Sequence, residues 1–179
     1  MRSRRTARRS FIAISLIAAS LVACSNSGRP PKTGAFVRLG GGIEYHDPNV
    51  HVGQVWWLAL QPLRVRRGVR SVTITGVRLA SRYPGVTLVG TARFSLKQTG
   101  NTLFNVATPS DLERERLRPS GPFVGATELP GDPADYGAVE VRFDRPGVFK
   151  IVDVVLSYRT PEGSGEQTID CDFTMTVSP

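Results

Sequence analysis

Apolar and polar residues alternate strictly near the C-terminus of the chain. Residues 169–177 read Ile-Asp-Cys-Asp-Phe-Thr-Met-Thr-Val, with an apolar side chain at every second position. This period of two predicts a strand with one buried face and one face in solvent, and it places Cys171 on the buried face. A β-branched run, residues 147–158, precedes it, and the Pro- and Gly-containing segment 160–165 lies between them. The two runs predict a β-hairpin.

Shorter apolar stretches lie upstream, separated by glycine and proline. In residues 69–80 the alternation changes parity on either side of Gly76, so we expect a β-bulge at that glycine. Arg145-Pro-Gly-Val-Phe-Lys-Ile151 resembles the start of a late strand in many bacterial immunoglobulin-like domains. The pattern predicts an all-β fold, an Ig-like antiparallel β-sandwich of seven or eight strands. The further strand candidates are residues 35–39, 54–63, 86–96, 102–106 and 139–143.

One segment carries the pattern of a helix start. Ser110-Asp-Leu-Glu113 has the spacing of a capping box, and the charged residues after it stop before Pro119. We therefore predict one short surface helix, beginning at Ser110, inside the long connection 107–136.

Two adjacent tryptophans lie in one strand candidate. Neighbouring side chains of a strand point to opposite faces, so both cannot enter the same core. Trp56 shares its parity with Leu58 and Leu60, and we place it inside. Trp57 then lies on the outer face, where we expect the long connection or the N-terminal segment to cover it.

The N-terminus carries the pattern of an export signal. Residues 1–9 are rich in arginine. Residues 11–23 then form an uncharged apolar run that is short for a membrane span. The run ends in Leu-Val-Ala-Cys, which resembles the lipobox of bacterial lipoproteins. The resemblance implies a signal peptide over residues 1–23, cleavage between Ala23 and Cys24, and a diacylglyceryl thioether on Cys24. Two acyl chains, such as palmitate, anchor a protein to a membrane stably.

Arg8-Arg9-Ser-Phe-Ile also resembles the twin-arginine export signal, although Ala7 and Ala13 depart from its pattern. A basic leader readily contains Arg-Arg pairs, so the general secretory route stays open as an alternative. The chain has 20 arginines and 3 lysines, which indicates a GC-rich genome and, with the style of the signal, an actinobacterial source.

The mature chain divides into a tether and one domain. Residues 24–34 hold Cys24 and a stretch without any apolar side chain larger than proline. As a flexible coil this tether spans about 17 Å, which lifts a domain just clear of the lipid headgroups. Residues 35–179 are enough for one domain with its own core.

Composition excludes several classes of protein. With 40% hydrophobic and 21% charged residues, the chain is neither a disordered tail nor a multi-span membrane protein. Without the five arginines of the first nine residues, 18 basic residues face 15 acidic ones, so the net charge falls from +8 to +3. That balance removes the charge-based case for nucleic-acid binding.

Motifs of catalysis are missing from the sequence. It contains no Gly-x-Ser-x-Gly, no His-Glu-x-x-His, no phosphate-binding glycine loop and no Cys-x-x-Cys. Only two histidines are present, which limits triad chemistry. We therefore expect a protein that is not an enzyme and has no cofactor. Cys171 has no intrachain partner once Cys24 is lipidated, and its buried parity predicts an inert core thiol.

Both histidines fall within Glu44-Tyr-His-Asp-Pro-Asn-Val-His51. His46, Asp47 and His51 offer imidazole and carboxylate ligands, so a zinc- or copper-binding protein is an alternative function. The spacing is not a recognised ligand spacing, and Asp-Pro-Asn is common in turns. A polar loop with two solvated histidines is therefore the simpler interpretation.

Four arginines surround a glycine in Arg64-Val-Arg-Arg-Gly-Val-Arg70. Arg64, Arg66, Arg67 and Arg70 have the charge to contact anionic lipid headgroups or an acidic wall polymer, to which the tether would bring them close. A solvated turn at the tip of a hairpin is the simpler interpretation, because a run of charges usually marks a solvent face.

The sequence thus predicts a membrane-anchored lipoprotein on the outer face of the cytoplasmic membrane. We expect an extracytoplasmic, monomeric, non-enzymatic module that binds a partner or supports the envelope. Its expected partners are the membrane, through diacylglyceryl Cys24, and an envelope protein or an anionic wall polymer.

Overall fold

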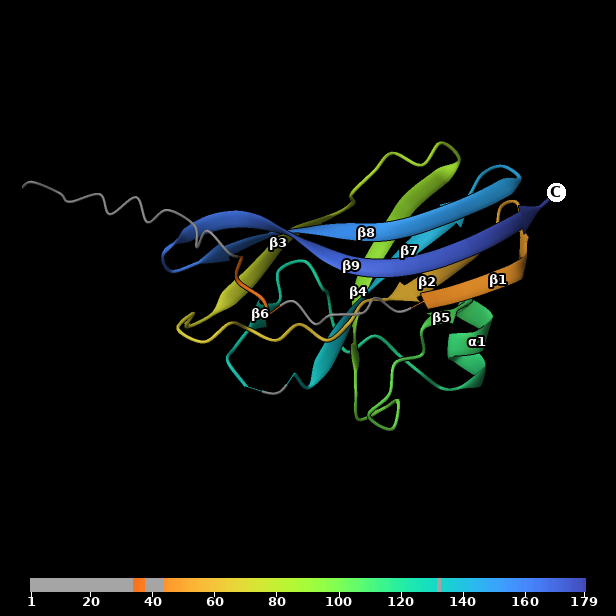
Figure 1. Ribbon diagram of the computed structural model, residues 1–179. Coiled ribbons are helices and arrows are strands. Elements are labelled where there is room, and N and C mark those ends of the chain that lie inside the picture. Colours follow the sequence, from red (N-terminus) through yellow and green to blue (C-terminus); the bar gives the residue numbers. More distant parts are fainter. Residues whose placement is uncertain (1–33, 38–43, 132) are drawn as a thin grey trace, which may run out of the picture.

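A computed structural model describes residues 34–37, 44–131 and 133–179 (Figure 1). These residues form nine strands and one helix. In chain order they are β1 (Glu44–His51), β2 (Val55–Ala59), β3 (Val72–Leu79), β4 (Val86–Ser95), β5 (Val106–Ala107), α1 (Pro109–Arg114), β6 (Thr127–Glu128), β7 (Asp135–Phe143), β8 (Gly147–Thr160) and β9 (Gly163–Ser178).

The strands form two sheets that face each other. One sheet has the order β1-β9-β8-β3-β6 and the other β4-β7-β2-β5. Strands β2, β3, β4, β7, β8 and β9 occupy the places of strands B to G in an immunoglobulin domain, where BED lie in one sheet and CFG in the other. The predicted all-β sandwich is therefore confirmed. The strand count is higher than predicted, and β1 pairs with β9 in parallel rather than antiparallel.

The alternation of β9 confirms the predicted C-terminal hairpin. Its inward residues, from Gln167 to Val177, are buried at every second position. Thr160 pairs with Gly163, so a two-residue turn joins β8 to β9. Side chains from both sheets meet in one core that includes Leu58, Phe143 and Phe173. Because β9 pairs with β8 on one side and with β1 on the other, it is an interior strand of the five-stranded sheet.

The bulge at Gly76 is also confirmed. The register between β3 and β8 shifts between Ile74 and Gly76. After the shift, Val77 and Leu79 pack against the same core as Ile74 does before it. One extra residue therefore corrects the change of parity.

A second apolar cluster covers the outer face of the four-stranded sheet. Trp56 is buried in the main core, whereas Trp57 packs on the outer face against Phe94, with ring centroids 5.7 Å apart. Phe104 and Leu117, from the connection that carries α1, complete this cluster. The placement of both tryptophans is as predicted, and side chains of the chain after β4, such as Leu103 and Phe104, pack in the same cluster as Trp57.

The predicted start of the helix was wrong by two residues. Thr108, not Ser110, caps α1: its hydroxyl accepts from the Asp111 N–H, and the Asp111 carboxylate accepts from the Thr108 N–H. Pro109 follows the cap, where its fixed φ suits the first turn and its missing N–H costs nothing. The capping box is therefore Thr108-Pro-Ser-Asp111, two residues upstream of the expected one.

The polar segment 44–51 is a strand rather than the expected loop. Its backbone pairs with β9 from Glu44, opposite Asp172, to His51, opposite Ser178. The register shifts between Asp47 and Val50, an interval that contains Pro48. Since proline has no N–H to donate, an irregular stretch is expected there.

Candidate functional site

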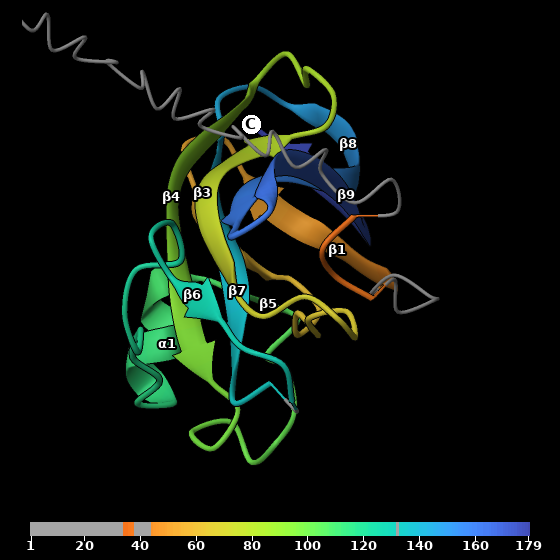
Figure 2. The ribbon, with the colours of Figure 1, turned by 90° about the vertical axis from the view of Figure 1, so that its left-hand side faces the viewer.

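Residues 64–70, which we name the arginine turn, connect β2 to β3. Because these two strands belong to different sheets, the arginine turn is a crossover and not the hairpin tip that the sequence suggested. Gly68 adopts φ +89°, and the Val69 N–H donates to the Arg66 carbonyl at 3.1 Å. The turn lies at the end of the molecule where the described chain begins (Figure 2).

The N-terminal segment joins the domain beside this turn. We name residues 34–37 the N-terminal joint. Phe36 is fully buried and forms a bridge with Val65. The Val37 N–H donates to the Arg64 carbonyl at 2.8 Å, and the Arg66 N–H donates to the Ala35 carbonyl at 2.9 Å. The joint and the arginine turn are thus one short antiparallel ladder.

A buried glutamine fixes the other side of the joint. Gln167 of β9 accepts from the Phe36 N–H at 2.9 Å and donates to the Phe36 carbonyl at 3.1 Å. The ring of Phe36 packs edge-on against Tyr158, with centroids 6.0 Å apart. Gly34 has φ +77°, and a Cβ there would overlap with the Gln167 side chain. The chain is therefore held rigidly from its first described residue.

The four arginines play different parts. Arg66 is only partly exposed and donates to the Phe36 carbonyl at 3.3 Å, so it belongs to the joint. Arg70 is 80% exposed and lies 3.5 Å from the Glu162 carboxylate at the β8–β9 turn. Arg64 and Arg67 are exposed. The predicted contact set thus divides into one structural arginine and three at the surface.

An open groove runs between the arginine turn and the loop after β6. Its volume is about 410 Å³, and its walls are Arg64, Val65 and Arg67 on one side and Pro130 and Gly131 on the other. The neighbouring Leu129 is 67% exposed, a high value for a leucine. No pattern in the sequence marks this loop as part of a site.

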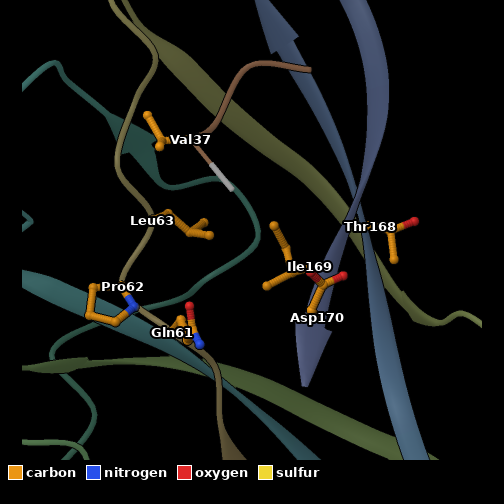
Figure 3. A pocket seen from close by; sticks show the side chains of 7 residues that line it. All are labelled: Val37, Gln61, Pro62, Leu63, Thr168, Ile169 and Asp170. Carbon is orange, nitrogen blue, oxygen red and sulfur yellow. The ribbon is translucent and has the colours of Figure 1, made fainter. Parts of the chain in front are cut away.

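A smaller cavity lies beside the joint, between the β2–β3 connection and β9 (Figure 3). Val37, Leu63 and Ile169 form its apolar part, and Gln61 and Asp170 supply polar groups. Its volume of about 20 Å³ has room for about one water molecule, so it does not admit an organic substrate.

The proposed metal ligands His46, Asp47 and His51 all belong to β1. In the register of β1 with β9, His46 lies opposite Thr174 and His51 opposite Ser178, positions that are roughly 13 Å apart along a strand. His51 is exposed, and the side chains of His46 and Asp47 lie outside the described part. Among the side chains that the structure describes, no three histidine, cysteine or acidic groups gather as metal ligands. The metal site stays a prediction.

The thiol of Cys171 is enclosed in the core. It is 4% exposed, and its Sγ lies 3.7 Å from the Ile151 carbonyl oxygen. Burial, reinforced by the charge of nearby Asp153, raises the pKa of this thiol to about 12. A protonated, inaccessible thiol is neither a nucleophile nor a metal ligand at neutral pH. The predicted burial of Cys171 is confirmed.

The remaining sequence-predicted residues, Arg8, Arg9, Ala23 and Cys24, lie outside the described residues. Within the described part, no helix is long and apolar enough to cross a membrane. Comparisons with protein-family models, with curated proteins and with solved structures found no match.

Proposed function

We propose that this protein is a lipid-anchored, extracytoplasmic module that binds a partner or supports the cell envelope without catalysing a reaction. Diacylglyceryl Cys24 anchors it to the outer face of the cytoplasmic membrane, residues 25–33 are the tether, and the β-sandwich is the working part. The lipobox and the basic, apolar leader carry the anchor.

The construction of the N-terminal joint is the observation that supports this proposal best. Phe36 is bonded on one edge to the arginine turn and on the other to Gln167 of β9. Only nine residues lie between Cys24 and Gly34, so an anchor at Cys24 keeps the joint within about 35 Å of the lipid even when the tether is fully extended. A rigid joint close to an anchor fixes which end of the sandwich stays near the membrane.

The chemistry of the described residues supports a binding or structural part over catalysis. The thiol of Cys171 is buried and protonated, and the cavity beside the joint has room for about one water molecule. Burial raises the pKa of the Glu128 carboxyl, and the positive charge of Arg93 opposes this shift.

Metabolic labelling with a palmitate analogue tests the anchor. The wild-type chain, expressed in its native host, should take up the label, and Cys24→Ala should not. Cys171→Ala is the matched control, because it removes the only other cysteine and should leave labelling unchanged. Absence of label from the wild type, or label retained by Cys24→Ala, would refute the proposal.

A further inference from the structure

We propose that the end of the sandwich that carries the arginine turn docks on anionic lipid headgroups. In this arrangement Arg64 and Arg67 contact headgroup phosphates, and the Leu129 side chain enters the apolar boundary below them. The inference rests on the proposed function, since the anchor at Cys24 brings this end to the membrane.

The first support is the charge at the groove. Arg64 and Arg67 line one wall of the groove, both are exposed, and Arg67 makes no ion pair with any described residue. The described residues of the opposite wall, Pro130 and Gly131, carry no charge. Guanidinium groups bind phosphate through two parallel hydrogen bonds, so this wall suits a phosphate headgroup.

The second support is the apolar surface beside that charge. Leu129, next to the groove, is 67% exposed, and Val37, bonded to the arginine turn, is 37% exposed. Exposed aliphatic side chains next to basic ones are characteristic of surfaces that lie in the membrane interface. A water-soluble anionic polymer would also bind the arginines, but such binding would not explain why the Leu129 side chain is exposed.

The third support is the place of the groove relative to the tether. The joint and the arginine turn form one ladder, so the chain that leads to Cys24 starts at the same end as the groove (Figure 2). The tether spans about 17 Å as a coil, so Arg64 and Arg67 are repeatedly carried to within the Debye length of about 8 Å from an anionic surface. Because the anchor keeps the effective concentration of lipid near this surface high, even a weak contact between the arginines and the headgroups is enough for docking.

The opposite end of the sandwich supplies a matched control. The turn between β7 and β8 lies at the other end of the sandwich from the joint (Figure 1). Val148, the second residue of β8, follows this turn and is 68% exposed. A fluorophore sensitive to polarity is attached to Leu129→Cys or to Val148→Cys in the full mature, lipidated protein. The native thiol of Cys171 is buried and does not compete for the label.

Each labelled protein is reconstituted in vesicles of phosphatidylcholine alone or of phosphatidylcholine with phosphatidylglycerol. With phosphatidylglycerol present, the probe at residue 129 should shift to the blue and lose its quenching by iodide. The probe at residue 148 should do neither. If the two probes respond alike, or if residue 129 does not respond while the protein stays on the vesicles, docking is refuted and the anchor is not.

Charge removal tests the arginines. Arg64→Gln with Arg67→Gln should lower the ratio of docked to undocked protein by about five-fold for each arginine. Arg82→Gln with Arg145→Gln removes two exposed charges elsewhere and should leave the ratio unchanged. If both pairs of substitutions lower the ratio of docked to undocked protein equally, the arginine turn is not the docking surface and the proposal is wrong. If soluble polyphosphate protects residue 129 and vesicles do not, the surface binds polymer and the proposal is wrong.

Discussion

The side-chain amide of Gln167 occupies the place of a neighbouring strand for Phe36. It accepts from the Phe36 N–H at 2.9 Å and donates to the Phe36 carbonyl at 3.1 Å, as a paired backbone would. The two residues lie 131 positions apart in the chain. This contact connects the beginning of the domain to its last strand.

Gln167→Ala should therefore destabilise the domain well beyond an ordinary surface change. Both backbone groups of Phe36 lose their partner on the β9 side, and an unsatisfied buried group costs about 1–3 kcal/mol. We expect a loss of about 2–4 kcal/mol in the free energy of unfolding, measured by urea denaturation.

Gln98→Ala is the control for this change. Gln98 accepts only one bond, from the Arg118 N–H at 3.3 Å, and this bond is exposed. Its replacement should alter the free energy of unfolding by at most about 0.5 kcal/mol. Equal effects of the two variants would contradict the structural part that we assign to Gln167.

The fold and the joint were not equally accessible from the sequence. The strict alternation of 169–177 specified its buried face, because a slip by one residue would turn Asp170 and Asp172 into the core. Gln167 has the same buried parity, and a buried amide requires partners. The identity of that partner did not follow, since nothing local connects residue 167 to Phe36.

Strand β1 shows why other elements escaped the pattern. Residues 44–51 are largely polar and contain Pro48, so neither alternation nor propensity marks them as a strand. They pair because β9 offers a free edge, which is a property of the assembled sheet. The groove depends likewise on distant segments, because β6 pairs with β3 and brings the loop that holds Pro130 beside the connection that holds Arg64.

The native thiol of Cys171 should resist labelling until the domain unfolds, which a thiol reagent with and without urea will show. The contribution of the Cys171 thiol to the free energy of unfolding also depends on pH. The folded pKa, about 12, lies above the usual value of 9, so the contribution is complete below pH 9 and disappears as the pH rises toward 12.

Above pH 9 the wild type should therefore lose stability relative to Cys171→Ala, by up to about 1.4 kcal/mol per pH unit. Urea denaturation of both proteins at pH 8 and pH 10 measures the difference. Rapid labelling of the native protein, or parallel curves for the two proteins, would show that the thiol is exposed.

The ring of Phe123 packs directly against the backbone of Gly137 in β7. A Cβ at this position would overlap with the ring atoms, and Phe123 is fully buried. Gly137→Ala should therefore cost about 1–3 kcal/mol by overpacking. Gly76→Ala is the control in another strand, where the nearest atom, Cβ of Ser157, is at an ordinary 3.5 Å. Thermal unfolding should show a clear loss only for Gly137→Ala.

The side chain of Trp57 should stabilise the connection after β4 although it lies on the outer face of the four-stranded sheet. Its ring packs against Phe94, which in turn packs against Phe104 at a centroid distance of 5.0 Å. Trp57→Ala should cost about 2–4 kcal/mol and make residues 96–117 sensitive to proteases. Val89→Ala, at an exposed position of β4, should change neither. Unchanged protease resistance in Trp57→Ala would mean that the cluster does not hold the connection.

The central claim is that this sandwich is held at a membrane through Cys24. Mass spectrometry of the N-terminal peptide, from mature protein purified out of its native membranes, tests that claim most directly. We expect a chain that lacks residues 1–23 and begins with Cys24 carrying a diacylglyceryl group. A mature chain that begins at another residue, or with an unmodified Cys24, would contradict it.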